Sequence, residues 1–222
     1  MQREDLRRVR ADVIASQKEF LRSQGSECVR EHDAILDDLR AVGASFDALD
    51  AIQNHPDWSA DQARVLGEWL RKAQCDYNLG HVSISLRRKG GRAVLGAMIE
   101  VFEDGTNERP DAEPYVSLGM AIASHQSQLP LEVLLRLTTI NSSLARSAII
   151  EALGRRKDGR EVAIPHLVSL LGDPATGFVI KALARLDAVE ARDQIAPYTS
   201  SDNHFIRTSA RTGLKKFDRE KR

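Results

Sequence analysis

The sequence predicts an all-α protein and, within that class, an α-solenoid of stacked helix pairs. Apolar residues recur at three- and four-residue steps along most of the 222-residue chain, as in helices that bury one face. Aromatic residues make up only 5% of the chain, which is low for a sandwich or barrel of strands. A short pattern also recurs about every 30 residues, a spacing typical of two-helix repeats. We expect repeats in residues 111–222 and a helical N-terminal part in residues 1–110.

The composition is that of an ordinary folded protein. Hydrophobic residues make up 42% and charged residues 29%, and 32 basic side chains balance 32 acidic ones. No run approaches the roughly 18 apolar residues of a membrane span, and the start at Met1–Asp5 lacks the apolar core of a signal peptide. We therefore expect a cytoplasmic protein that does not bind a membrane.

The charge is distributed unevenly along the chain. Residues 1–140 carry 17 basic and 22 acidic side chains, whereas residues 141–222 carry 15 basic and 10 acidic ones. Nearly all of the basic excess follows Asp202. This basic C-terminal helix is suited to contact phosphate or an acidic protein. It also fits a solvated last helix whose cations are favoured by the helix dipole.

The N-terminal part is predicted to begin with three helices. Apolar positions indicate helices over about residues 3–23 and 27–42, ended by Gly25 and Gly43, which tolerate the left-handed backbone of a helix end. Ser45 is a suitable cap for a short third helix carrying Leu49 and Ile52.

The next helix has a clear start signal after His55-Pro56. Ser59 and Gln62 have the spacing of a capping box, with Trp58 placed to pack on Ala63 as a hydrophobic staple. Trp69 falls on the apolar face of the same helix. Both tryptophans thus have structural roles, and an aromatic binding platform is the weaker interpretation.

Residues 79–86 fit either a strand or a helix, and we favour a helix because a lone strand would have no ladder partner. Gly90-Gly91 precedes a further helix that ends near Phe102. The polar stretch from Asp104 to Pro114 is predicted to be the longest loop, either a binding loop or a seam between two halves.

The C-terminal half carries the internal repeat. A small residue followed by a large apolar one recurs at spacings of 31, 30 and 31 residues, in Ala121-Ile122, Ala152-Leu153, Ala182-Leu183 and Gly213-Leu214. Small residues let neighbouring helices approach closely, and stacking buries the apolar stripe that a single helix pair leaves exposed. The pattern therefore predicts a series of packed helix pairs.

Each patterned helix is predicted to be followed by a second helix. Pro130 and Pro165 suit the first turn of a helix, where the missing N–H has no intrahelical partner. On these second helices Glu132, Arg136, His166 and Ser169 fall between the apolar positions. Repeat proteins often bind through such a row, although the same residues would also fit a merely solvated surface.

Residues 141–154 and 163–173 resemble a HEAT-like repeat of the phycobilisome-lyase type, and the segment with Asp202, Arg207 and Leu214 is similar. The resemblance covers about residues 113–217. The sequence departs from the family pattern at Thr176-Gly177, where a basic residue would stand. The resemblance implies stacked helix pairs with an exposed binding surface. It also implies an enzymatic alternative, because some members of that family act on tetrapyrroles attached to cysteine.

The sequence offers little catalytic chemistry. Its six histidines are scattered, and no metal-binding, phosphate-loop, dinucleotide or nucleophile-elbow motif is present. Cys28 and Cys75 match no zinc spacing and are expected to be small buried thiols. We expect no catalytic residue, no metal and no cofactor.

The leading hypothesis is a non-enzymatic protein-binding module, an adaptor or an inhibitor similar to bacterial immunity proteins. The residues expected to bind the partner are Glu132, Arg136, His166, Ser169, Arg207 and Arg211. The second hypothesis is nucleic-acid binding through the basic C-terminal helix, as in HEAT-like DNA glycosylases, which the zero net charge disfavours. The third is a bilin lyase or isomerase.

Overall fold

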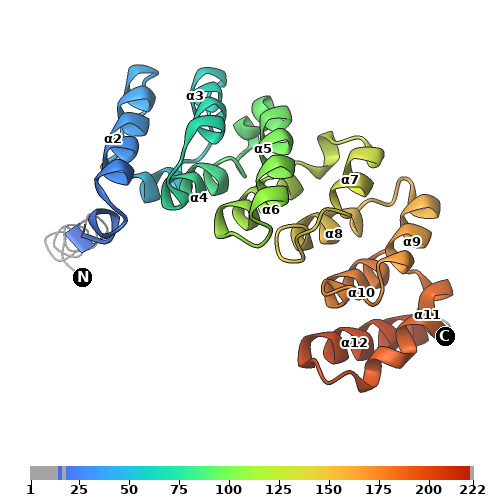
Figure 1. Cartoon of the computed structure of the whole chain (residues 1–222). Coiled ribbons are helices and arrows are strands. Elements are labelled where there is room, and N and C mark those ends of the chain that lie inside the picture. Colours follow the sequence, from blue (N-terminus) through green and yellow to red (C-terminus); the bar gives the residue numbers. More distant parts are fainter. Residues whose placement is uncertain (1–14, 17–18, 221–222) are drawn as a thin grey trace, which may run out of the picture. The chain divides into compact units, whose positions relative to one another are not determined.

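The computed structural model of the chain describes residues 15–16 and 19–220, and this part contains helices and no strand (Figure 1). The all-α prediction is confirmed. Residues 15–16 and 19–23 are helical, whereas the rest of the helix predicted over 3–23 lies outside the described residues. The chain divides into two compact units, residues 1–101 and 102–222, with the boundary inside helix α5.

After the helical residues 15–16 and 19–23, the described part of unit 1 contains three further α-helices, two 3₁₀ helices and the start of α5. These are α2 (Ser26–Ala41), η1 (Leu49–Asn54), α3 (Ala60–Lys72), α4 (Asp76–Ser85), η2 (Lys89–Val94) and α5 (Leu95–Glu108). The ambiguous segment 79–86 is helical, as favoured, in α4. The short helix expected after Ser45 is a 3₁₀ helix that begins only at Leu49.

The predicted start of α3 is confirmed. The Ser59 hydroxyl accepts the N–H of Gln62, and the Gln62 side chain accepts the N–H of Ser59, which completes the capping box. Both tryptophans are buried in unit 1. The indole of Trp58 donates to the carbonyl of Ser85 at 3.0 Å, and that of Trp69 donates to the carboxylate of Asp38 at 2.9 Å.

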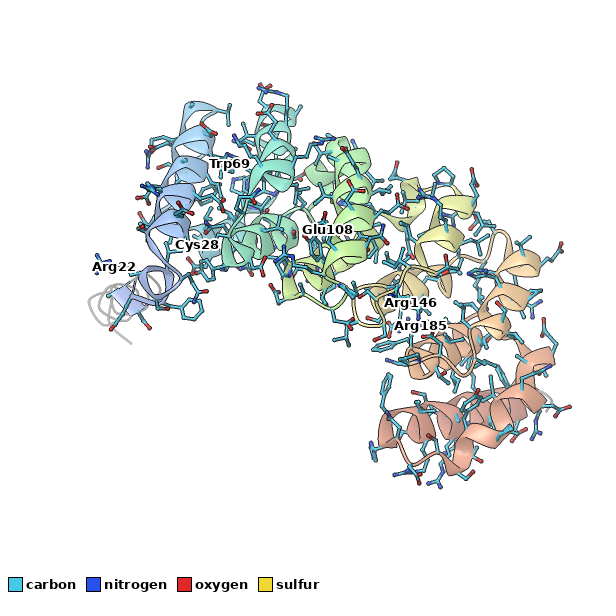
Figure 2. All side chains as sticks on the ribbon, viewed as in Figure 1. Arg22, Cys28, Trp69, Glu108, Arg146 and Arg185 are labelled. Atoms are coloured by element: carbon cyan, nitrogen blue, oxygen red, sulfur yellow. A yellow bond between two sulfur atoms is a disulfide. The ribbon has the colours of Figure 1, made fainter. Side chains whose placement is uncertain are left out.

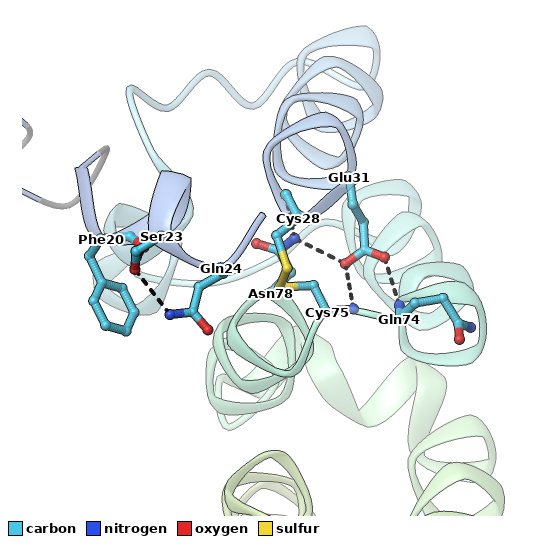
Figure 3. Close-up of a disulfide and its surroundings, with 8 residues drawn as sticks. All are labelled: Phe20, Ser23, Gln24, Cys28, Glu31, Gln74, Cys75 and Asn78. Carbon is cyan, nitrogen blue, oxygen red and sulfur yellow. Dashed lines mark hydrogen bonds between the residues drawn. A yellow bond between two sulfur atoms is a disulfide. The ribbon is translucent and has the colours of Figure 1, made fainter. Parts of the chain in front are cut away.

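The two cysteines are not free thiols, which corrects the prediction. Cys28 in α2 and Cys75 at the start of α4 form a disulfide, with their Cα atoms 5.3 Å apart (Figure 3). The carboxylate of Glu31 lies beside the bond and accepts hydrogen bonds from the backbone N–H groups of Gln74 and Cys75 and from the side-chain amide of Asn78. The prediction failed because two cysteines 47 residues apart give no sign of contact until the helices are placed.

Unit 2 continues from α5 through pairs of helices. These are α6 (Glu113–Ser124), η3 (Gln126–Gln128), α7 (Leu131–Leu137), α8 (Ser147–Leu153), α9 (Arg160–Ser169), α10 (Thr176–Arg185), η4 (Val189–Ala191), α11 (Arg192–Ile195), η5 (Ala196–Ser200) and α12 (His204–Glu220). Helix α8 packs against α6, α7 and α10, and α10 packs against α9 and α12.

The long loop predicted over Asp104–Pro114 is wrong. Helix α5 continues to Glu108 and α6 begins at Glu113, so only a short turn remains. Packing explains the helix: Gly105 is buried against the ring of Tyr115, and the Thr106 hydroxyl donates to the carbonyl of Phe102 at 2.6 Å. Asp104, Asn107 and Glu108 lie on exposed positions of α5 rather than in a loop.

The repeated small-then-apolar pattern lies at the contacts between successive helices of unit 2. The first three pairs, in α6, α8 and α10, are fully buried. Gly154, one residue after the pair in α8, lies so close to α10 that a Cβ atom there would be 2.5 Å from the Cα of Ala182. The small residues therefore set the close approach of α8 and α10.

Candidate functional site

The repeat spacing identifies a row of surface positions on unit 2, of which Met120 and Thr212 are exposed and Glu151 and Lys181 are partly buried. Positions spaced by 31, 30 and 31 residues place Met120, Glu151, Lys181 and Thr212 at equivalent points of α6, α8, α10 and α12. The ammonium of Lys181 binds the carboxylate of Glu151 at 3.0 Å. Equivalent residues of α8 and α10 are therefore neighbours on the surface of unit 2.

One side of α10 carries a continuous stripe from aromatic to cationic groups. Phe178, Lys181 and Arg185 follow at intervals of three and four residues, which places them on one face of the helix. Seven helical residues separate the ends of this stripe by about 10 Å. We call these three residues the α10 stripe. Figure 2 marks Arg185 at its cationic end.

Helix α12 adds a second aromatic ring beside the stripe. The ring centroids of Phe205 and Phe178 are 4.8 Å apart, and the Lys181 ammonium lies 5.4 Å from the Phe205 centroid. Phe205 is 39% exposed although it is large and apolar. Gly177 makes room for it, since a Cβ there would meet the Phe205 ring at 2.3 Å. The result is an aromatic surface bordered by a cation.

Glu151 is the carboxylate at the centre of this surface. Its side chain is 20% exposed and also accepts a hydrogen bond from Arg185 at 2.8 Å. Burial acts to raise the pKa of Glu151, but the hydrogen bonds from Arg185 and Lys181 outweigh it, so the pKa is lowered from its usual value. Glu151 is therefore ionised at neutral pH.

Arg155 lies one turn beyond Glu151 and forms no ion pair with a carboxylate of the described residues. Its guanidinium donates to the side-chain oxygen of Gln126 at 3.2 Å. Burial lowers the pKa of Arg155 and the neighbouring charge of Arg185 lowers it further, against the attraction of Glu151. Three cations thus lie near one carboxylate, which pairs directly with two of them. We call the set of Glu151, Arg155, Phe178, Lys181, Arg185 and Phe205 the basic–aromatic face.

Four of the six predicted partner-binding residues lie on helices α7 and α9. Glu132 and Ser169 are exposed. Arg136 is exposed but ion-paired with Glu103 of α5. His166 is half-buried and hydrogen-bonded to the Thr138 hydroxyl at 2.7 Å, and burial lowers its pKa.

The other two predicted residues lie on α12. Arg207 is half-buried and binds the carbonyls of Ser201 and Asp202, so it fixes the turn before its own helix. Arg211 is exposed. Two of the six are in contact on α9, where the Ser169 hydroxyl donates to the backbone carbonyl of His166 at 2.7 Å.

Sequence reasoning missed most of the basic–aromatic face. It did not single out Phe178, Lys181 or Phe205. The signal was present in the repeat spacing, which aligns Glu151 with Lys181 and Arg155 with Arg185. Helices α7 and α9, which form the other row of each pair, also carry exposed polar residues, so the spacing alone does not select this face. The prediction that Pro165 lies in the first turn of its helix is wrong, because α9 begins at Arg160 and contains Pro165 in its interior.

Two features are absent from the described part of the chain, a metal-binding cluster and a membrane-spanning helix. No group of three or more His, Cys, Asp or Glu side chains there is placed to hold a metal ion. None of the described helices combines the length and the apolar character that crossing a bilayer requires.

Comparisons with known proteins identify no relative of this chain. A scan against protein-family models gives no match, and searches of curated proteins and of solved structures give none at a significant level.

Proposed function

We propose that the chain is a non-enzymatic protein-binding module, an adaptor or an inhibitor, in which HEAT-like helix pairs form an α-solenoid. We further propose that the basic–aromatic face of unit 2 is its binding surface. The observation that carries this proposal is the α10 stripe, which joins exposed aromatic surface to cations that outnumber their carboxylate.

The packing of unit 2 supports a repeat-based surface. Helices α6, α8, α10 and α12 contact one another in chain order, and α7 and α9 each pack on the next patterned helix. Such an arrangement presents one row of helices to a partner, and repeat proteins commonly use a row of this kind. The predicted binding residues on α7 and α9 then belong to the opposite row of the pairs. The proposed binding surface therefore excludes Glu132, Arg136, His166 and Ser169.

The chemistry of the basic–aromatic face supports recognition rather than catalysis. Arg and aromatic side chains such as Phe are enriched at binding surfaces, because they offer large contact area together with charge or ring contacts. Glu151 is held ionised by two cations, so its lowered pKa makes it a poor general acid. The groups on the face are thus suited to hold a partner in place.

Site-specific photo-crosslinking tests the proposal. A benzoylphenylalanine placed at Thr212, an exposed position in the row, is expected to form one discrete protein adduct in extracts of the source organism. The same group at the exposed Glu161 of α9 is the matched control and is expected to form none. Adducts of equal yield at both positions, or adducts that persist unchanged when Phe205→Ser and Arg185→Gln are combined, would contradict the proposal.

Nucleic-acid binding is a second candidate, favoured by one observation on α12. Arg211 and Lys215 are exposed, and no ion pair ties either to another described residue. The zero net charge of the chain and the ionised Glu151 in the middle of the face oppose this function. A gel shift at low salt with single- and double-stranded oligonucleotides separates the two candidates.

A further inference from the structure

We infer that the segment bound by the basic–aromatic face carries an apolar side chain and a carboxylate held about 10 Å apart, the length of the α10 stripe. This inference rests on the proposed function and specifies its partner: an acidic stretch of protein with an apolar anchor. It follows from the two ends of the stripe, which call for different chemistry.

The aromatic end calls for an apolar group. Phe205 exposes a large apolar ring, and its neighbour Phe178 is half-buried against it at 4.8 Å. Covering this surface with an aliphatic or aromatic side chain removes apolar area from water and adds ring contacts. Well-packed anchors of this kind dominate the binding energy of many interfaces.

The cationic end calls for a carboxylate. Arg155 and Arg185 lie close enough for mutual repulsion, and the single carboxylate of Glu151 is already shared by Arg185 and Lys181. An incoming carboxylate restores the charge balance that Glu151 alone does not provide.

The same geometry favours a protein over a nucleic acid. A nucleic acid brings a negative charge with every nucleotide, so its phosphates would pass over Glu151, whose carboxylate stays ionised. An acidic peptide can place its carboxylate at Arg155 and Arg185 and leave uncharged residues above Glu151. The face therefore favours a partner that places a carboxylate at Arg155 and Arg185 and no negative charge above Glu151.

The length of the stripe fixes the spacing of the two groups in the partner. An extended chain advances about 3.3 Å per residue, so the apolar and acidic residues would be three positions apart. In a helical partner, which rises about 1.5 Å per residue, they would be seven positions apart and on one face.

The test uses the full chain and synthetic fluorescein-labelled peptides. The main probe has the core Trp-Ser-Ser-Glu-Glu between Gly-Ser flanks. Three comparison probes replace the glutamates by lysine, replace the tryptophan by serine, or consist of an oligothymidine of similar length. Fluorescence anisotropy and amide shift perturbations at low salt are expected to show saturable binding of the main probe alone, centred on α8, α10 and α12.

Variants locate the binding on the face. Arg155→Gln, Arg185→Gln and Phe205→Ser are each expected to weaken the main probe by about threefold to tenfold. Arg136→Gln is the matched control, because it also removes an exposed, ion-paired arginine but lies on α7. It is expected to leave binding unchanged. Circular dichroism of each variant separates lost binding from lost folding, and Arg155→Gln breaks no ion pair of the described chain.

The inference is overturned if the lysine probe binds as tightly as the glutamate probe, if oligothymidine binds more tightly, or if Arg136→Gln weakens binding as much as Arg185→Gln does. A protein adduct at Thr212 together with no binding of the main probe would overturn the spacing rule and leave the protein-binding function standing. Absence of both would overturn the two together.

Discussion

The carboxylate of Glu31 in α2 accepts the backbone N–H of Cys75 at 3.3 Å, directly before the first turn of α4. Glu31 thus supplies the acceptor that the start of α4 lacks, since Cys75 provides no side-chain cap. Cys28, one turn before Glu31, is joined to Cys75 by the disulfide. A covalent and an electrostatic link therefore hold α2 against the same turn of α4.

Removing the disulfide is expected to destabilise unit 1. The bond closes a segment 47 residues long, and losing it frees the unfolded chain, so Cys28→Ser with Cys75→Ser should lower the free energy of unfolding by about 2–4 kcal/mol. Both tryptophans of the chain, Trp58 and Trp69, lie in unit 1, so tryptophan fluorescence during denaturant unfolding reports on it. Dithiothreitol should shift the wild-type midpoint and leave the double variant unchanged. Equal midpoints with and without reductant in the wild type would contradict this role.

Two glycines of unit 2 make a matched test of helix packing. In Gly154→Ala the new Cβ would lie 2.5 Å from the Cα of Ala182, so α8 and α10 must separate, and we expect a loss of about 1–3 kcal/mol. In Gly213→Ala the new Cβ would meet its neighbours at an ordinary 3.5 Å, and the gain in helix propensity of up to about 1 kcal/mol should leave stability equal or higher. Thermal unfolding followed by circular dichroism measures both. Similar losses in the two variants would show that α8 and α10 are not held by close approach.

The ion pair between Arg146 and Asp173 is expected to matter more than the surface pairs. The Arg146 side chain is only 8% exposed and also donates to the carbonyl of Thr138 at 3.0 Å. Asp173→Ala leaves this buried charge without its carboxylate, which should cost about 3 kcal/mol or more. The control is Asp218→Ala, whose pair with Arg192 has side chains 56% and 40% exposed and should contribute less than about 1 kcal/mol. Equal losses in urea unfolding would refute the distinction.

His166 should make unit 2 less stable in mild acid. Burial lowers its pKa below the ordinary 6.5, so the folded state binds the proton less readily than the unfolded state does. Stability should therefore fall as the pH drops through the unfolded pKa toward the folded one. His166→Gln, which can still bond the Thr138 hydroxyl, should lose less stability between about pH 7 and about pH 5. A variant with the same pH dependence as the wild type would exclude this histidine as the cause.

The starts and ends of several helices could be predicted from the sequence, because each is determined by residues that are close together in the chain. The Ser59–Gln62 capping box and the helix ends at Gly25 and Gly43 depend on residues within a few positions of each other. The Asp104–Pro114 segment was mispredicted because its helix depends on Tyr115 packing over Gly105, a contact made only when α5 meets α6. The disulfide depends on a similar meeting of α2 and α4.

The candidate site was harder to predict than the fold. Alternation of apolar and polar residues on α7 and α9 correctly marked Glu132 and Ser169 as exposed, but exposure alone does not select a binding surface. The basic–aromatic face arises from three helices, and its charge imbalance appears only when Lys181 and Arg185 are seen to share the carboxylate of Glu151. Pairing partners of this kind are not visible in a single sequence.

The cross-link between Cys28 and Cys75 has a practical consequence for making the protein. Thiols of proteins produced in a reducing cytosol usually stay unpaired, whereas export or oxidative refolding allows them to join. Preparations from the two routes would be different covalent species, with the start of α4 held by Glu31 alone in one of them. Mass spectrometry of the intact chain, which resolves the two hydrogens lost on oxidation, should therefore precede any binding experiment.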